Sequence, residues 1–140
     1  MKIRIAESDE DIQACFSVMS ELRPKLSPEN FVETIRDMET EGYRLAFLSV
    51  DGSPPVCVAG YRLETRLWCG RILYVDDLVT AETERSRGFG AAMLDWLKET
   101  ARAEGCAELH LDSGVWRKDA HRFYRDQGME DSSLHFRIEV

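Results

Sequence analysis

Residues 71–105 combine three patterns in direct succession: a strand, a loop with two glycines and a long helix. The strand pattern covers residues 71–80, and helical periodicity covers residues 88–104, with Gly105 at the helix end. Strand and helix patterns alternate in the rest of the chain as well, which is typical of an α/β fold. We therefore predict a single domain over residues 1–140, with a mixed, largely antiparallel twisted sheet flanked by helices.

The other elements are predicted from apolar periodicity and from turn residues. Ser8 is expected to cap a first helix that Pro24 ends, and Pro28 to take the first position of a second helix that Gly42 closes. A further helix is predicted over residues 118–127. Further strands are predicted at residues 2–6, 43–50, 56–63, 108–111 and 134–140, and core positions at Phe16, Phe31 and Phe47.

Charge and composition exclude several classes of protein. The chain has 18 basic and 26 acidic residues and a formal charge of −8, which argues against a nucleic-acid binder and favours a small cationic substrate. No apolar run approaches the ~20 residues of a membrane span. The N-terminus turns acidic too early for a secretory signal, so we expect a cytoplasmic protein that does not bind membranes.

Cysteine and histidine spacing gives no sign of a metal site. The four cysteines include no CxxC pair, and the three histidines show no zinc-ligand spacing with them. We expect no metal, and reduced cysteines inside the core of a cytosolic protein.

The loop before the long helix has the chemistry of a phosphate site. Free N–H groups at a helix N-terminus suit a phosphate, and Gly88 and Gly90 let a ligand approach the backbone closely. Arg85 and Arg87 add charged donors. Met93 stands where a dinucleotide fingerprint needs glycine, and no Gly-Lys-Ser/Thr follows, so a dinucleotide site and a nucleotide triphosphatase are excluded. The alternative is that the glycines serve only a tight turn.

The run Arg85-Ser86-Arg87-Gly88-Phe89-Gly90 resembles the Arg/Gln-x-x-Gly-x-Gly/Ala signature of the GCN5-related N-acetyltransferases. The resemblance covers residues 74–105 and resumes over residues 120–129. Glu82 stands where the family usually has Pro, and Ser86 where it often has Gly. The resemblance implies a fold of the acyl-CoA N-acyltransferase type, with acetyl-CoA as cosubstrate and no metal.

The resemblance also implies roles for single residues. Backbone amides of the loop would bind the pyrophosphate, and amides at the end of the preceding strand would hold the pantetheine and the acetyl carbonyl. Tyr124 would protonate the departing thiolate, unless it is a packed aromatic beside Phe123. The residues to which the resemblance gives a cosubstrate-binding role are Leu78, Val79, Arg85, Ser86, Arg87, Gly88, Phe89, Gly90 and Ala91.

Candidates for the acceptor side are aspartates. Asp76 and Asp77 are consecutive in an apolar strand, so they are predicted to point to opposite faces. Asp76 matches the carboxylate that polyamine acetyltransferases place near the substrate amine, as a catalytic base, with a purely structural role or a bridging water as alternatives. Asp77 would bind substrate or anchor a loop, and Asp112 would bind a cationic group or cap a turn.

Four other residues have weaker signals. Asp119 is expected to cap the helix of Tyr124. His121 is expected at the surface, with proton relay as the alternative, and Trp68 and Trp116 either line the acceptor site or pack.

Together these observations predict an N-acetyltransferase that acetylates a primary amine, with a small cationic amine as the expected acceptor. The amine would attack acetyl-CoA directly in a ternary complex, because no cysteine lies in the segments that carry the resemblance. The alternatives are a protein or peptide N-acetyltransferase and a non-catalytic acyl-CoA sensor. The family resemblance also suggests a homodimer.

Overall fold

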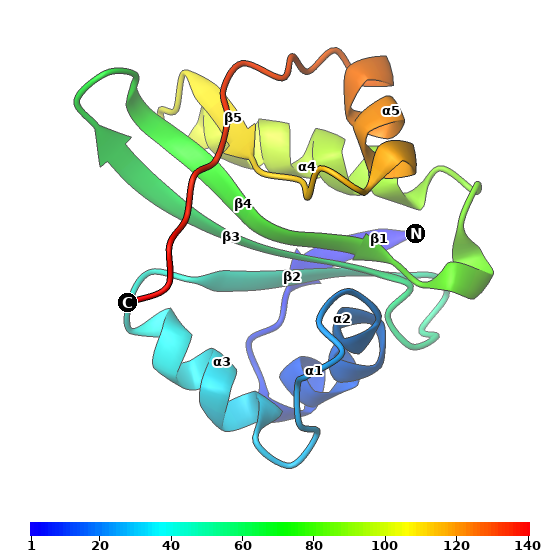
Figure 1. Cartoon of the computed structure of the whole chain (residues 1–140). Coiled ribbons are helices and arrows are strands. Elements are labelled where there is room, and N and C mark those ends of the chain that lie inside the picture. The colour runs from blue at the N-terminus through cyan, green and yellow to red at the C-terminus, as the bar shows by residue number, and fades with distance from the viewer. The chain divides into compact units, whose positions relative to one another are not determined.

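A five-stranded mixed sheet in the order β1-β2-β3-β4-β5 organises the computed structural model, which describes all residues, 1–140 (Figure 1). Each of the first four strands runs antiparallel to its neighbour in this group. The strands are β1 (Lys2–Ile5), β2 (Arg44–Ser49), β3 (Cys57–Arg66), β4 (Gly70–Thr80) and β5 (Glu108–Leu111). The predicted fold class is confirmed.

The chain also forms five α-helices and one short 3-10 helix. They are α1 (Asp9–Ala14), α2 (Phe16–Leu22), α3 (Phe31–Glu39), the 3-10 helix η1 (Glu82–Glu84), α4 (Phe89–Ala103) and α5 (Lys118–Asp126). The chain divides into two compact units, residues 1–110 and residues 111–140, and α5 belongs to the second. No helix is both long enough and apolar enough to cross a lipid bilayer.

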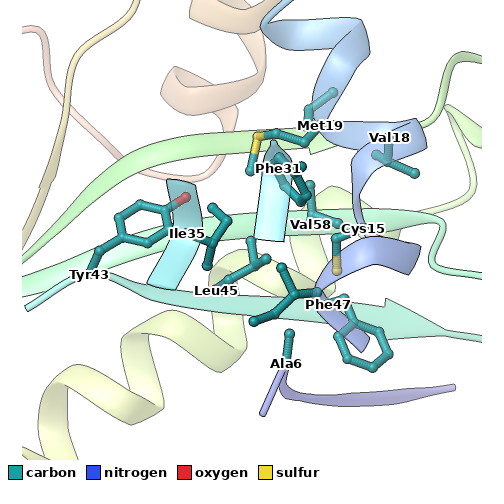
Figure 2. Close-up of a cluster of buried hydrophobic side chains, with 12 residues drawn as sticks. Ala6, Cys15, Val18, Met19, Phe31, Ile35, Tyr43, Leu45, Phe47 and Val58 are labelled. Atoms are coloured by element: carbon teal, nitrogen blue, oxygen red, sulfur yellow. The ribbon is translucent and has the colours of Figure 1, made fainter. Parts of the chain in front are cut away.

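Helices α1, α2 and α3 cover one face of the sheet, and α4 covers the other face (Figure 1). The core under α1–α3 includes Phe31 and Ile35 of α3, which lie near Leu45 of β2 (Figure 2). Burying an aromatic or aliphatic side chain of this size contributes roughly 1.5–3 kcal/mol, so this layer holds α1–α3 in place. Phe31 and Phe47 are buried and Phe16 is partly buried against them, as predicted.

On the opposite face, α4 buries an apolar stripe that includes Met93 and Leu97. Its Trp96 ring meets the Tyr61 ring of β3 edge-on, with centroids 6.1 Å apart. Both faces of the central strands are therefore covered, because α4 packs against β3 and β4.

Two helix starts test the predicted capping. Ser8 caps α1 as expected, because its side chain accepts a hydrogen bond of 3.0 Å from the Asp11 N–H. The prediction for Pro28 is wrong, since α3 begins three residues later, at Phe31. Residues 28–30 form a turn instead, and the first helical hydrogen bond runs from the Thr34 N–H to the Asn30 carbonyl.

The predicted last strand, residues 134–140, is also wrong. No strand forms there, although apolar and polar residues alternate, because a strand needs a partner for its backbone groups and this segment has none. The apolar members of the alternation are all exposed: Leu134, Phe136, Ile138 and Val140.

Candidate active site

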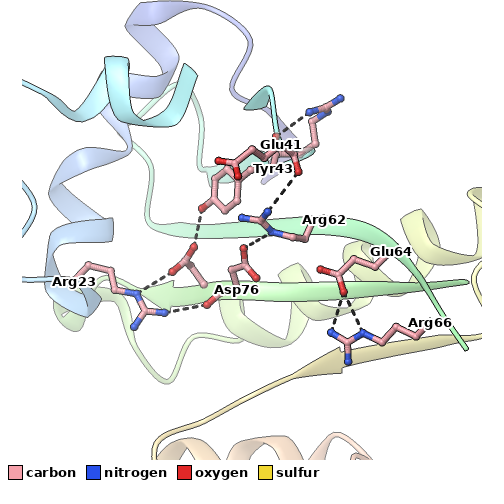
Figure 3. A network of polar contacts seen from close by, with 9 residues as sticks. Arg23, Glu41, Tyr43, Arg62, Glu64, Arg66 and Asp76 are labelled. Atoms are coloured by element: carbon pink, nitrogen blue, oxygen red, sulfur yellow. Dashed lines mark hydrogen bonds and ion pairs between the residues drawn. The ribbon is translucent and has the colours of Figure 1, made fainter. Parts of the chain in front are cut away.

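A β-bulge in β4 changes the predicted orientation of the two strand aspartates. Gly60 of β3 pairs with Asp77, but the next residue, Tyr61, pairs with Val75, so Asp76 is the extra residue on β4. A bulge interrupts the alternation of side chains along a strand. Asp76 and Asp77 consequently join one polar network on one face of the sheet (Figure 3), and the prediction of opposite faces is wrong.

Asp76 is held by one of its two oxygens. The Arg62 Nε donates a 2.7 Å hydrogen bond to Asp76 Oδ2, and no protein group donates to Oδ1. Burial raises the pKa of Asp76, and the guanidinium of Arg62 opposes that rise. A carboxylate with one anchored oxygen and one open oxygen can accept a proton from a bound amine.

Asp77 is bonded through both oxygens. The Tyr43 hydroxyl donates to Oδ2 at 2.8 Å, and the Arg23 Nε donates to Oδ1 at 2.9 Å. Arg23 also donates to the backbone carbonyl of Asp76, so the residue after α2 is attached to the bulge. These contacts match the anchoring alternative for Asp77.

Gly60 makes room for this network. A Cβ at Gly60 would lie 1.6 Å from the Tyr43 hydroxyl oxygen, so any side chain there would displace Tyr43. Burial raises the pKa of Tyr43, and the neighbouring Asp77 charge raises it further, so the phenol stays protonated and donates. The Arg62 guanidinium lies over the Tyr43 ring, 5.6 Å from its centroid.

Sequence reasoning missed Arg23, Tyr43 and Arg62 as members of this site. The only signal for Arg62 is a charged residue in an otherwise apolar strand, and Arg23 lies in a turn beside Pro24. Their partners are far away in the sequence, so no local pattern connects them to Asp76 and Asp77.

The loop before α4 presents free backbone donors. Gly88 is the N-cap residue, with φ +84°, and no side chain caps the helix. The first helical hydrogen bond is made by the Ala92 N–H to the Gly88 carbonyl, so the N–H groups from Ser86 to Ala91 have no partner in the chain. This row of donors at the positive end of a 15-residue helix suits a phosphate.

The charged side chains of this loop are exposed. Arg87 pairs with Glu84, and its guanidinium lies 5.1 Å from the centroid of the Phe89 ring. Arg85 has no ion pair in the chain, which leaves it available to an anion. A carboxylate oxygen of Glu21 accepts a 2.8 Å hydrogen bond from the Glu82 N–H and thereby fixes the start of the loop to α2.

Leu78 and Val79 lie near the end of β4, opposite Ala59 and Val58 of β3. On the other side of β4, the four-residue strand β5 is much shorter than the 11 residues of β4. The Ala107 N–H donates to the Arg71 carbonyl, so β5 starts beside the start of β4 and ends before the Leu78 level. Therefore no strand pairs with the backbone groups at the end of β4 on the edge that faces away from β3.

The second unit contains the predicted residues from Asp112 onward. Tyr124 lies in α5, with its ring 5.4 Å from that of Phe123. Asp112 contacts His135 at 3.2 Å, and His121 Nε2 contacts the Gly114 carbonyl at 2.7 Å. The predicted cap is wrong, because α5 starts after Arg117 without a side-chain cap.

In the same unit, Asp119 lies in the first turn of α5 and pairs with Arg122. Trp116 packs over Gly114, although most of its surface is exposed.

Comparison with known proteins identifies the architecture. Residues 10–129 match the Acetyltransferase (GNAT) family. The chain belongs to this family. It is 34% identical over 135 residues to YhdJ, an N-acetyltransferase of Bacillus subtilis (strain 168). The aligned residues cover 95% of this chain and 94% of that protein.

Further GNAT acetyltransferases share part of the sequence or the fold. Bovine (Bos taurus) thialysine N-epsilon-acetyltransferase is 33% identical over 88 residues, which cover 60% of this chain and 52% of that protein. The structure of aminoglycoside N-acetyltransferase AAC(6')-Iy in complex with CoA superposes with a TM-score of 0.86 at 12% identity, covering 99% of this chain and 93% of that one. The protein is thus an acetyl-CoA-dependent N-acetyltransferase.

The loop fits the cosubstrate of this family. A Cβ at Gly88 would meet nothing within 4 Å, so this position favours glycine because of its φ of +84° and not because of a close contact. The unpaired donors from Ser86 to Ala91 and the exposed Arg85 complement a pyrophosphate.

Proposed function

We propose that this GNAT acetyltransferase transfers the acetyl group of acetyl-CoA to a primary amine of a small cationic molecule. The observation that carries the proposal is the bulge at Asp76, which leaves one oxygen of a partly buried carboxylate open beside Arg62. An alkylammonium must lose a proton before its nitrogen can attack, and Asp76 Oδ1 accepts that proton directly or through a water. The relatives named for thialysine and for aminoglycosides acetylate amines, which supports an amine acceptor here.

The cosubstrate supplies an acetyl thioester, and the chain supplies its position. In this proposal the N–H groups from Ser86 to Ala91 hold the pyrophosphate, with Arg85 and Arg87 as charged donors. The backbone amides of Leu78 and Val79 hold the pantetheine and orient the acetyl carbonyl. Tyr124 gives its proton to the departing thiolate, and Asp112 attracts the cationic acceptor.

Direct transfer to the amine is supported by the state of the buried cysteines. Burial raises the pKa of Cys57 to about 11 and that of Cys15 to about 12, so both thiols stay protonated and are poor nucleophiles at neutral pH. An acetylated cysteine intermediate on either residue is therefore not part of the proposal. A homodimer and a cytoplasmic location stay predictions.

The first experiment combines calorimetric titration of acetyl-CoA and CoA with a thiol-release assay. The acceptor panel contains diamines, polyamines, thialysine, aminoglycosides and lysine-containing peptides, and each small amine has its N-acetylated form as a matched control. We expect binding of acetyl-CoA and thiol release only with free cationic amines.

Each other outcome overturns part of the proposal. Release confined to peptides would assign the protein to peptide acetylation. Binding without release from any acceptor would favour an acyl-CoA sensor. Absence of binding by the folded protein would remove the loop from the cosubstrate site.

A further inference from the structure

Three residues with metal-binding side chains meet beside the turn between β3 and β4. Cys69 lies in the turn between β3 and β4, and Glu108 and His110 lie in β5. One ligand atom from each residue lies within 4.8 Å of the corresponding atoms of the other two. None of these residues takes part in the site described above.

The fold, rather than a sequence motif, brings them together. Glu108 and His110 are two positions apart in a strand, so their side chains share one face of β5. The hydrogen bond of 3.2 Å from the Ala107 N–H to the Arg71 carbonyl places the start of β5 beside the start of β4, just after Cys69. The spacing along the chain matches no common zinc motif, which is why the sequence predicted no metal.

The imidazole of His110 is held in a defined orientation. Its Nε2 lies 2.7 Å from Glu108 Oε1, and its ring centroid lies 5.6 Å from that of Trp68. Cys69 and His110 are half-buried and Glu108 is exposed, so the cluster is open to solvent on one side. A cation can therefore enter without unfolding of the sheet.

We propose that Cys69, Glu108 and His110 bind a Zn²⁺ ion, with water as the fourth ligand. A thiolate, an imidazole and a carboxylate are the ligand types of zinc, whereas Ca²⁺ and Mg²⁺ prefer oxygen ligands alone. Bond lengths of about 2.0–2.3 Å to zinc require the three side chains to move closer together. This site is separate from the acetyl-transfer chemistry and independent of the acceptor.

Binding has a defined proton balance. The Cys69 thiol loses its proton to solvent when sulfur bonds to the metal. The Nε2–H of His110 donates to the Glu108 carboxylate in the metal-free protein. On binding, that proton moves through solvent to Nδ1, so the imidazole stays neutral, and the freed Nε2 lone pair and a Glu108 oxygen bind the ion in place of their hydrogen bond. A bound ion would join the β3–β4 turn to β5, where the chain itself provides few connections.

The test is titration of metal-free protein with ZnCl₂ by calorimetry and with CoCl₂ by absorbance. We expect one ion per chain, a sulfur-to-cobalt charge-transfer band and the ligand-field bands of four-coordinate cobalt. Cys69→Ser and His110→Gln should each weaken zinc binding by at least about tenfold. MgCl₂ should not compete.

Two matched variants serve as controls. Cys106→Ser changes another partly buried cysteine, and His135→Gln changes a histidine that contacts Asp112. Both should bind zinc like the unchanged protein. The proposal is overturned if the folded protein binds no zinc, or if His135→Gln abolishes binding while His110→Gln does not.

Alkylation provides a measurement that needs no substitution. Zinc should slow the reaction of iodoacetamide with Cys69, followed by mass spectrometry of the peptides, and should leave the rate at Cys106 unchanged. Equal rates at Cys69 with and without zinc would contradict the proposal, even if a Cys69 variant fails to fold.

Discussion

At the residue scale, the environment of Asp76 separates it from its neighbour Asp77. Asp77 uses both oxygens to hold Tyr43 and Arg23, whereas Asp76 uses one oxygen to hold Arg62. Two adjacent residues of the same type therefore have different chemical capacities. The open oxygen of Asp76 is the feature available to an acceptor amine.

Asp76→Asn is expected to lower kcat roughly 10²-fold, because the amide cannot accept the ammonium proton. Burial raises the pKa of Asp76, so the carboxylate protonates at a higher pH than an ordinary aspartate does. Activity of the unchanged protein should consequently fall as the pH drops through that raised pKa, and the variant should lack this limb. Steady-state rates across pH measure both effects.

The matched control is Asp37→Asn, which changes an exposed aspartate of α3. It should keep both the rate and the pH profile. An Asp76→Asn variant with an unchanged profile would assign Asp76 a purely structural role.

Tyr124→Phe is expected to lower kcat roughly 10²-fold while the Kd for acetyl-CoA stays nearly unchanged. The reason is that the phenol would act only on the departing thiolate. Turnover from thiol release and Kd from calorimetry check the prediction. Equal losses in turnover and in acetyl-CoA affinity would contradict an acid role.

At the scale of elements, the segment from β4 to α4 combines two local departures from regular geometry. The bulge rotates Asp76 out of the strand alternation, and the loop places both Ser86 and Gly88 in the left-handed region, with φ of 65° and 84°. The loop then opens a helix whose first N–H groups are uncapped. The free donors and the open carboxylate thus lie at opposite ends of one short stretch of chain.

Ser86→Gly is expected to raise the free energy of unfolding by up to about 1 kcal/mol. A residue with a Cβ is strained at positive φ, and glycine removes the strain, although it adds entropy to the unfolded chain. Urea unfolding at constant m-value measures the change. Gly88→Ala should shift stability in the opposite direction, and a loss of stability in Ser86→Gly would refute the strain argument.

The double variant Arg85→Ala, Arg87→Ala is expected to weaken CoA binding by at least about tenfold, because it removes two charge-assisted donors. Its kcat at saturating acetyl-CoA should change little. Calorimetry with CoA checks the affinity. As a control, Arg102→Ala removes an exposed arginine from the opposite end of α4 and should leave the Kd unchanged. An unchanged Kd in the double variant would remove both arginines from the site.

At the scale of the whole molecule, the net charge of −8 is the main long-range property. An acidic protein attracts cations and repels anions over distances that salt shortens, to about 10 Å at 0.1 M. At long range the protein therefore attracts a cationic acceptor and repels the anionic cosubstrate. The local donors before α4 must overcome that repulsion.

The KM for a cationic acceptor is expected to rise several-fold between about 20 and 300 mM salt, because screening weakens its attraction to the acidic protein. Initial rates at saturating acetyl-CoA measure it. An uncharged amine analogue of similar size serves as the control and should show a smaller change. A KM that stays constant for the cationic acceptor would argue against a cationic substrate.

The sequence by itself determined the parts of this protein that depend on neighbouring residues. The glycines and arginines before α4, the length of that helix and the Ser8 cap all act through local backbone geometry, so a linear pattern was enough to predict them and the family. Local patterns gave a wrong prediction where no partner strand was present. Residues 134–140 alternate between apolar and polar, but no neighbouring strand pairs with them, so they form no strand.

Only the tertiary structure decided how distant residues meet. The pairing of β3 with β4 created the bulge that turned Asp76 and Asp77 to one face, because register depends on hydrogen bonds between strands and not on either strand alone. The same pairing brought Arg62 to Asp76, and the position of β5 brought Glu108 and His110 to Cys69. Contacts of this kind form only when the sheet closes over its core, and no stretch of the sequence contains them.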